Sequence, residues 1–316
     1  MSYSFVFPGQ GSQSVGMLAE LSVEQPAVRE TFQEASAALG YDLWKLTQDG
    51  PEGALNSTER TQPALLAAGV AAWRAFCAAS GYRPPFMAGH SLGEYTALVC
   101  AGALDFADAV KLVEFRGRAM QRAVPEGAGA MAAILGLEDA DVRLACEEAA
   151  QGEVVSAVNF NSPGQVVIAG NRAAVDRAIE LLKARGAKRA LPLPVSVPSH
   201  CALMKPAAAA MAERLADVPV RAPAIPVVHN VDVATHDQPD AIRRALVEQL
   251  YNPVRWTETV RLLADSGVTG IVECGPGKVL AGLNRRIEKS MAIAVVTDPA
   301  SLADAVQRIH EAGDEQ

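Results

Sequence analysis

The sequence lacks several features that would assign it to a particular class of protein. No apolar run reaches the ~18 residues that a membrane-spanning helix needs. The five cysteines are scattered and form no C-x-x-C pair, which is typical of free thiols in a reducing compartment. The five histidines include no H-E-x-x-H motif, so the sequence favours neither a structural nor a catalytic metal.

The start of the chain also lacks the basic region of a signal peptide. Instead, a short apolar segment is followed directly by glycines. We therefore expect a cytoplasmic protein. The formal net charge of -8 disfavours binding to nucleic acid or to anionic membranes. Any acidic partner would have to contact a local basic patch.

What is present is an alternation of short apolar runs with helical patterns, which predicts an α/β protein. Strands are expected at 4–7, 86–88, 226–229 and 270–273, and helices at 58–80, 92–101, 105–123, 240–250, 256–266 and 279–289. Asp105 is a suitable N-cap for its helix. The length of 316 residues fits one large domain with a smaller companion.

The middle of the chain predicts that companion. Strands at 130–135, 154–158, 165–169 and 189–193, with helices at 139–150 and 173–184, give the order β-α-β-β-α-β of a ferredoxin-like unit. A turn is expected at 161–164. We therefore predict a subdomain at 125–196, inserted into a large domain formed by 1–124 and 197–316.

Residues 89–93 read G-H-S-L-G and match the G-x-S-x-G nucleophile elbow, between a short strand and a helix as that motif requires. The turn would expose the Ser91 hydroxyl at the carboxyl edge of the sheet. The backbone amide of Leu92, first in the helix, could then donate to an oxyanion. The alternative is a glycine-rich turn that carries an idle serine.

Gly9-Gln10-Gly11 follows the first strand directly. A dinucleotide-binding G-x-G-x-x-G loop would need glycine at 14, where Ser14 stands. The loop could instead present a second backbone amide to an oxyanion, or it could be only a tight turn.

A serine nucleophile needs a base, and any of the five histidines could supply it. His90 adjoins the serine, but its side chain should point elsewhere from a sharp turn. His200 follows Pro198-Ser199 in a loop, where catalytic groups often lie. Cys201 is an alternative nucleophile by position, although it has no elbow around it.

Arg116 stands out on the helix at 105–123. Spacing of three and four places it in an apolar stripe with Leu112, Val113 and Met120, whereas Arg118 faces water. A buried charge is costly unless it is paired, and no acidic residue shares the stripe. The partner is therefore a ligand carboxylate, or else the arginine is structural and pairs with groups elsewhere.

Taken together, five segments resemble the malonyl-CoA–acyl carrier protein transacylases of fatty-acid synthesis. They are F-P-G-Q-G-S-Q at 7–13, G-H-S-L-G-E at 89–94, V-N-F-N-S-P-G-Q at 158–165, V-P-S-H at 197–200 and E-C-G-P-G at 273–277. The resemblance implies an α/β-hydrolase-like core with a parallel sheet and a ferredoxin-like subdomain.

The resemblance also implies the roles of individual residues. The nucleophile falls on Ser91, its general base on His200, and the oxyanion hole on the backbone amides of Gln10 and Leu92. The malonyl-carboxylate anchor falls on Arg116. Gln249 corresponds to the residue whose backbone carbonyl orients the histidine, in place of the acid of a hydrolase triad.

The implied reaction is a ping-pong transfer from malonyl-CoA to the thiol of holo acyl carrier protein, with no bound cofactor or metal. Rival interpretations are the same fold in polyketide synthesis or malonate decarboxylation, a serine hydrolase, and a carrier-protein-binding subunit with a vestigial site. We expect a monomer. Carrier proteins are acidic, so Lys188, Arg189, Arg285 and Arg286 are candidate docking residues, or else solvated surface charges.

Overall fold

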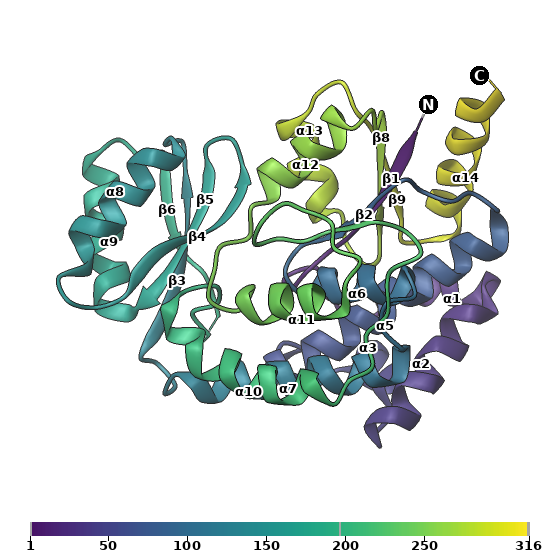
Figure 1. Cartoon of the computed structure of the whole chain (residues 1–316), viewed down its shortest axis with the longest axis horizontal. Coiled ribbons are helices and arrows are strands. Elements are labelled where there is room, and N and C mark those ends of the chain that lie inside the picture. Colours follow the sequence, from purple (N-terminus) through teal and green to yellow (C-terminus); the bar gives the residue numbers. More distant parts are fainter. Residues whose placement is uncertain (1, 196, 315–316) are drawn as a thin grey trace.

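The computed structural model describes residues 2–195 and 197–314, which form two β-sheets that lie side by side (Figure 1). The larger sheet has five strands, all parallel, in the order β7-β2-β1-β8-β9. Its strands are β1 Tyr3–Phe7, β2 Met87–Gly89, β7 Val227–Val228, β8 Gly270–Cys274 and β9 Ala292–Val296.

Side chains alternate between the two faces of this sheet, and both faces are buried, as expected for parallel strands. Phe5 and Phe7 point to the face covered by the long apolar α5 (Thr58–Ala79), whereas Val6 points to the face covered by α12 (Trp256–Asp265) and α13 (Val279–Ile287). The helices around the sheet are α1 Ala19–Glu24, α2 Pro26–Leu39, α3 Leu43–Asp49, α4 Glu52–Leu55, α5 Thr58–Ala79, α6 Leu92–Cys100, α7 Phe106–Ala123, α10 Lys205–Ala216, α11 Pro239–Glu248, α12 Trp256–Asp265, α13 Val279–Ile287 and α14 Pro299–Asp314.

The smaller sheet is antiparallel and has the order β4-β5-β3-β6. Its elements follow one another as β3 Gly129–Leu135, α8 Asp139–Ala150, β4 Val155–Ser162, β5 Gln165–Asn171, α9 Arg172–Ala184 and β6 Arg189–Pro192. Ile134 and Ile168 pack against α8 and α9 in a core of their own. The predicted β-α-β-β-α-β order and the predicted fold class are therefore confirmed.

Most predicted elements begin and end within a few residues of those observed. Asp105 caps α7 by accepting from the amides of Ala107 and Asp108. The predicted turn at 161–164 is too wide, because Asn161 and Ser162 still belong to β4. The elements α1 to α4, α10 and β9 were not predicted from the sequence. The subdomain limits at 125 and 196 stay a prediction, and residue 196 lies outside the described residues.

The two sheets are joined where β4 meets the segment before α12. Phe160 donates its amide to the carbonyl of Val254 at 3.0 Å, and Val254 donates its own amide to Val158 at 2.8 Å. Thr257 adds a side-chain bond to the Phe160 carbonyl. The antiparallel sheet is thereby held beside the carboxyl edge of the parallel sheet, where β1 and β2 end.

Within the described part of the chain, each helix is too short or too polar to cross a bilayer.

Candidate active site

Ser91 lies between β2 and α6 in a turn that is tight enough to exclude side chains on both flanks. A Cβ on Gly89 would lie 1.9 Å from the Gly93 carbonyl carbon, and a Cβ on Gly93 would lie 2.0 Å from the Phe7 oxygen. Ser91 itself has φ 52° and ψ -107°, a conformation that costs on the order of 1–3 kcal/mol and that surrounding contacts must hold. The geometry is that of a nucleophile elbow.

The structure brings Ser91 and His200 together although 109 residues separate them. The Nε2 atom of His200 lies 2.8 Å from the Ser91 Oγ, and its Nδ1 lies 2.7 Å from the backbone oxygen of Gln249. Because a carbonyl oxygen only accepts, Nδ1 carries the hydrogen and Nε2 has a free lone pair directed at the serine hydroxyl. The arrangement can therefore accept the serine proton.

Burial, together with the nearby positive charge of Arg116, lowers the pKa of His200 to about 3, against the opposing hydrogen bond to the Gln249 carbonyl. Both causes disfavour a second proton on the ring. His200 is therefore neutral near pH 7, the form in which it can act as a base.

The Arg116 side chain is 1% exposed and reaches the same hydroxyl from α7. Its Nη1 donates to Gln62 Oε1 at 2.8 Å, and its Nη2 donates to Gln249 Oε1 at 2.9 Å and to Ser91 Oγ at 3.2 Å. Burial lowers the pKa of Arg116, and the neighbouring Tyr95 and Glu94 oppose that shift.

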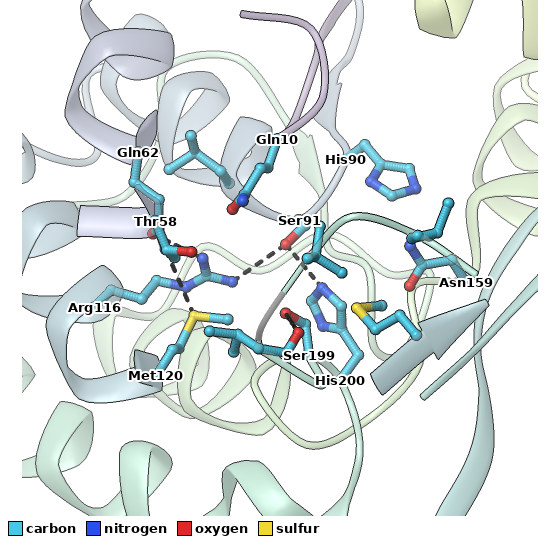
Figure 2. Close-up of a pocket in the computed structure, with 15 residues that line it drawn as sticks. Gln10, Thr58, Gln62, His90, Ser91, Arg116, Met120, Asn159, Ser199 and His200 are labelled. Carbon is cyan, nitrogen blue, oxygen red and sulfur yellow. Dashed lines mark hydrogen bonds between the residues drawn. The ribbon is translucent and has the colours of Figure 1, made fainter. Parts of the chain in front are cut away.

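Among residues 2–195 and 197–314, no carboxylate contacts Arg116, and its Nε has no partner. Figure 2 shows Arg116 and His200 converging on the Ser91 hydroxyl from two different elements. A buried guanidinium whose direct partners are all neutral can bind an anion beside the nucleophile.

Gln10 and Leu92 lie at the same edge of the sheet because β1 and β2 are paired in parallel, with Phe7 opposite Gly89. Both residues line the cavity that holds Ser91. Within the described residues the amides of Gln10 and Leu92 donate to no partner, whereas the Ser91 amide is bound by Asn230 Oδ1 at 2.8 Å. Two free amides therefore remain beside the serine, as an oxyanion hole needs.

The cavity has a volume of about 130 Å³. Its lining is partly polar, with Ser91, Arg116 and His200. The apolar part of the lining is formed by Met120, Met131, Leu193, Val195 and Val197. This small cavity suits a short acyl group with a charged end.

Comparison with known proteins agrees with this geometry. The model of the acyl transferase domain matches residues 4–311. The chain is 62% identical, over 96% of its length and 99% of the other protein, to the malonyl CoA-acyl carrier protein transacylase of Escherichia coli strain K12. A transacylase of the same name from Coxiella burnetii has a structure with a TM-score of 0.97 at 54% identity, covering 98% of both chains.

This chain belongs to the malonyl-CoA–acyl carrier protein transacylase family. The resemblance noted from the sequence is therefore confirmed. Another solved relative is a malonyl-transacylase in complex with the acyl carrier protein of a type II polyketide synthase. It is 58% identical, with a TM-score of 0.96 over 98% of this chain and all of the other.

The other candidate groups lie apart from the serine hydroxyl. The His90 ring bonds Asn161 Oδ1 at 2.8 Å instead of the serine. The Cys201 thiol donates to the Pro198 carbonyl, and burial raises its pKa to about 11, which makes it a poor nucleophile. Neither geometry supports a part in acyl transfer.

The sequence analysis missed four polar residues around the site, namely Gln62, Glu94, His229 and Asn230. Gln62 bonds Arg116, and the other three form a buried network behind the serine turn. The only sequence signal for Glu94 was a charged residue in an otherwise apolar helix. No local pattern indicated the partners, because Asn230 lies 139 residues from the serine it supports.

The four candidate docking residues are all exposed and flank one hairpin. Arg286 of α13 bonds Gln165, at the start of β5, at 2.8 Å, and Arg285 is its neighbour. On the other side Lys188 packs over Gly136, whose amide donates to Gly164 of the hairpin turn. Two basic pairs that are distant in the sequence therefore lie on either side of the β4–β5 turn.

The low pKa of His200 predicts an unusual pH profile. Because the neutral ring is the active form and its pKa is about 3, the rate at which a neutral sulfonyl fluoride modifies Ser91 should stay constant as the pH falls from 8 to ~5. Intact-mass spectrometry over time measures this rate. A half-loss near pH ~6.5, the ordinary value for histidine, would contradict the prediction.

Arg116→Ala is the matched control for that profile. It removes the positive charge and part of the burial, so the pKa of His200 rises and the acid limb moves to higher pH.

Proposed function

We propose that this chain transfers the malonyl group of malonyl-CoA to the phosphopantetheine thiol of acyl carrier protein in fatty-acid biosynthesis. The observation that carries the proposal is the buried Arg116 guanidinium, 3.2 Å from the Ser91 hydroxyl, with only neutral direct partners. An acyl group with a free carboxylate satisfies that charge and brings its thioester to the serine. The names of the relatives at high identity agree with this assignment.

In the first half-reaction Ser91 Oγ attacks the thioester carbonyl while His200 Nε2 takes the hydroxyl proton. Negative charge develops on the carbonyl oxygen, toward the amides of Gln10 and Leu92. When the C–S bond breaks, His200 returns its proton to the sulfur of coenzyme A. The products are free coenzyme A and a malonyl ester of Ser91.

In the second half-reaction the thiol of holo acyl carrier protein takes the place of coenzyme A. His200 accepts the thiol proton, the sulfur attacks the ester, and the proton passes to Ser91 Oγ as the C–O bond breaks. Each step exchanges a thioester for an ester or the reverse and is nearly thermoneutral. The exchange therefore requires neither a bound cofactor nor a metal.

The hydrogen bonds that Arg116 already makes determine which of its hydrogens a substrate carboxylate can bind. Both hydrogens of Nη2 are used, one by Gln249 Oε1 and one by Ser91 Oγ. A carboxylate that bridges Nη1 and Nη2 takes the hydrogen now given to the serine and leaves the Gln62 and Gln249 bonds in place. Two parallel hydrogen bonds of this kind distinguish arginine from lysine.

We propose that the enzyme is a monomer in the cytoplasm, a reducing compartment in which its five free cysteines would stay reduced. We also propose that 125–196 is a subdomain, supported by the separate core of the antiparallel sheet. The polyketide-synthase relative makes the same reaction on a polyketide carrier protein the second candidate. Rates with purified carrier proteins of both kinds distinguish the two.

The Ser91→Ala variant should fold normally and take up no malonyl group, because no other nucleophile lies in an elbow. Incubation with malonyl-CoA and no acceptor, followed by intact-mass spectrometry and peptide mapping, measures the adduct. The wild-type adduct should persist, since a transferase retains its acyl-enzyme. A full mass shift in Ser91→Ala would move the nucleophile elsewhere, and rapid turnover without acceptor would instead indicate a hydrolase.

The Arg116→Ala variant should lose malonyl transfer by roughly 100-fold or more, as when one partner of a buried charge pair is truncated. Acetyl transfer should be retained or increase, because acetyl has no carboxylate to bind. Arg116→Lys should recover only part of the malonyl rate. Equal loss of both activities, or unfolding, would make the arginine structural.

We propose that Lys188, Arg189, Arg285 and Arg286 attract the acidic carrier protein to the β4–β5 turn. Reversal of two of these charges, as in Arg285→Glu with Arg286→Glu, should raise the apparent KM for carrier protein about tenfold. The KM for malonyl-CoA should not change. Lys45→Glu, an exposed lysine of α3, is the control, and equal effects on both substrates would count against docking.

A further inference from the structure

Glu94 is a fully buried carboxylate that the mechanism above does not use. It is the third residue of α6 and does not line the cavity. Three donors surround it: His229 Nδ1 at 2.7 Å, the amide of Asn230 at 2.9 Å and Gln249 Nε2 at 2.9 Å. A buried carboxylate is tolerated only with such partners. Two of the three, Asn230 and Gln249, also bond residues of the active site.

One branch of this network leads to the serine turn. The backbone amide of Asn230 donates a hydrogen bond to Glu94, and the Asn230 side chain bridges both sides of the elbow. Its Oδ1 accepts from the Ser91 amide and its Nδ2 donates to the Gly89 carbonyl, both at 2.8 Å. These bonds hold the strained conformation of Ser91 and occupy its amide, so that the Leu92 amide is the one left free.

The other branch leads to the arginine. Gln249 Nε2 donates to Glu94 and also to the Ser91 carbonyl, and its Oε1 accepts from Arg116. The Glu94 Oε2 atom that faces Gln249 also accepts from the Asn230 amide, so it serves as a hydrogen-bond acceptor. Glu94 therefore requires the NH₂ group of Gln249 to face it, and this turns the amide oxygen toward Arg116.

The structure assigns to Glu94 the part of a positioning residue that holds Ser91 through Asn230 and Arg116 through Gln249. The role rests on the proposed malonyl transfer. Glu94 is one amide removed from the guanidinium and does not touch it, so it orients Gln249 while the hydrogen-bonding edge of Arg116 stays open to the substrate carboxylate. The residue thus contributes to selectivity for malonyl over acetyl, which simple support of the fold would not do.

Two substitutions of Glu94 distinguish the effect of its side-chain length from the effect of its negative charge. Glu94→Asp keeps the charge but is one methylene shorter, so it cannot satisfy all three donors; the malonyl-to-acetyl ratio of acylation rates should fall by roughly tenfold or more. Glu94→Gln should retain most of the wild-type malonyl-to-acetyl ratio of acylation rates. Its carbonyl can accept from Asn230 and Gln249 while its NH₂ faces His229, which then carries its hydrogen on Nε2.

A double-mutant cycle tests the route through Gln249. Gln249→Leu keeps the backbone carbonyl that binds His200 but removes the amide, so it should lower the same ratio. Combined with Glu94→Asp it should cause little further loss, because both changes break one branch. Additive losses, or an unchanged ratio in folded Glu94→Asp, would overturn the inference.

The readouts are the acylation rates of Ser91 by malonyl-CoA and by acetyl-CoA, its modification by a neutral sulfonyl fluoride, and the melting temperature. Glu114→Gln, on the same helix as Arg116 but paired with Arg60 and Arg118, is the control and should leave the ratio unchanged. If Glu94→Asp does not fold, Glu94→Ala takes its place in the double-mutant cycle, with the same expected and contradicting outcomes. Wild-type enzyme with no preference for malonyl would refute the proposed function itself, independently of Glu94.

Discussion

The positive charge of Arg116, buried beside the proposed nucleophile Ser91, constrains the rest of the site. Removing a charge from water is costly, and direct pairing with a carboxylate would be the usual compensation. Here the direct partners are the oxygens of Gln62, Gln249 and Ser91. Neutral dipoles stabilise the guanidinium enough to keep it in place and leave its charge for a ligand.

The same charge explains why a backbone carbonyl orients His200. A carboxylate in that position, as in a hydrolase triad, would lie near Arg116 and compete with a substrate carboxylate for its charge. The Gln249 carbonyl fixes the Nδ1 hydrogen without adding a charge. Gln249 thus serves both groups, the histidine through its backbone and the arginine through its side chain.

Several parts of the fold could be predicted because their signal is local. The elbow at 89–93, the buried face of α7 with Arg116 at its centre, and the β-α-β-β-α-β order each depend on spacing within a short segment. The helices α1, α3 and α4 were missed because each is at most seven residues long. The 14 residues of α2 do carry a local amphipathic pattern, with Val28, Phe32 and Ala35 on its buried face, and α2 could have been predicted. The network of Glu94, Asn230 and Gln249 could not be predicted, because hydrogen bonds between residues more than 130 positions apart leave no periodic pattern.

The two sheets contribute different kinds of residue to the lining of the cavity. Groups that take part in the proposed bond changes belong to the parallel-sheet unit and to the His200 loop, where backbone pairing and buried hydrogen bonds fix their positions. Met131 of β3, together with Leu193 and Val195 after β6, provides much of the apolar part of the lining. We expect substitutions in this part of the lining to change the size of acyl group that fits, because none of these side chains bonds Ser91, His200 or Arg116. The inserted sheet therefore offers a way to alter acyl size without altering the chemistry or the requirement for a carboxylate.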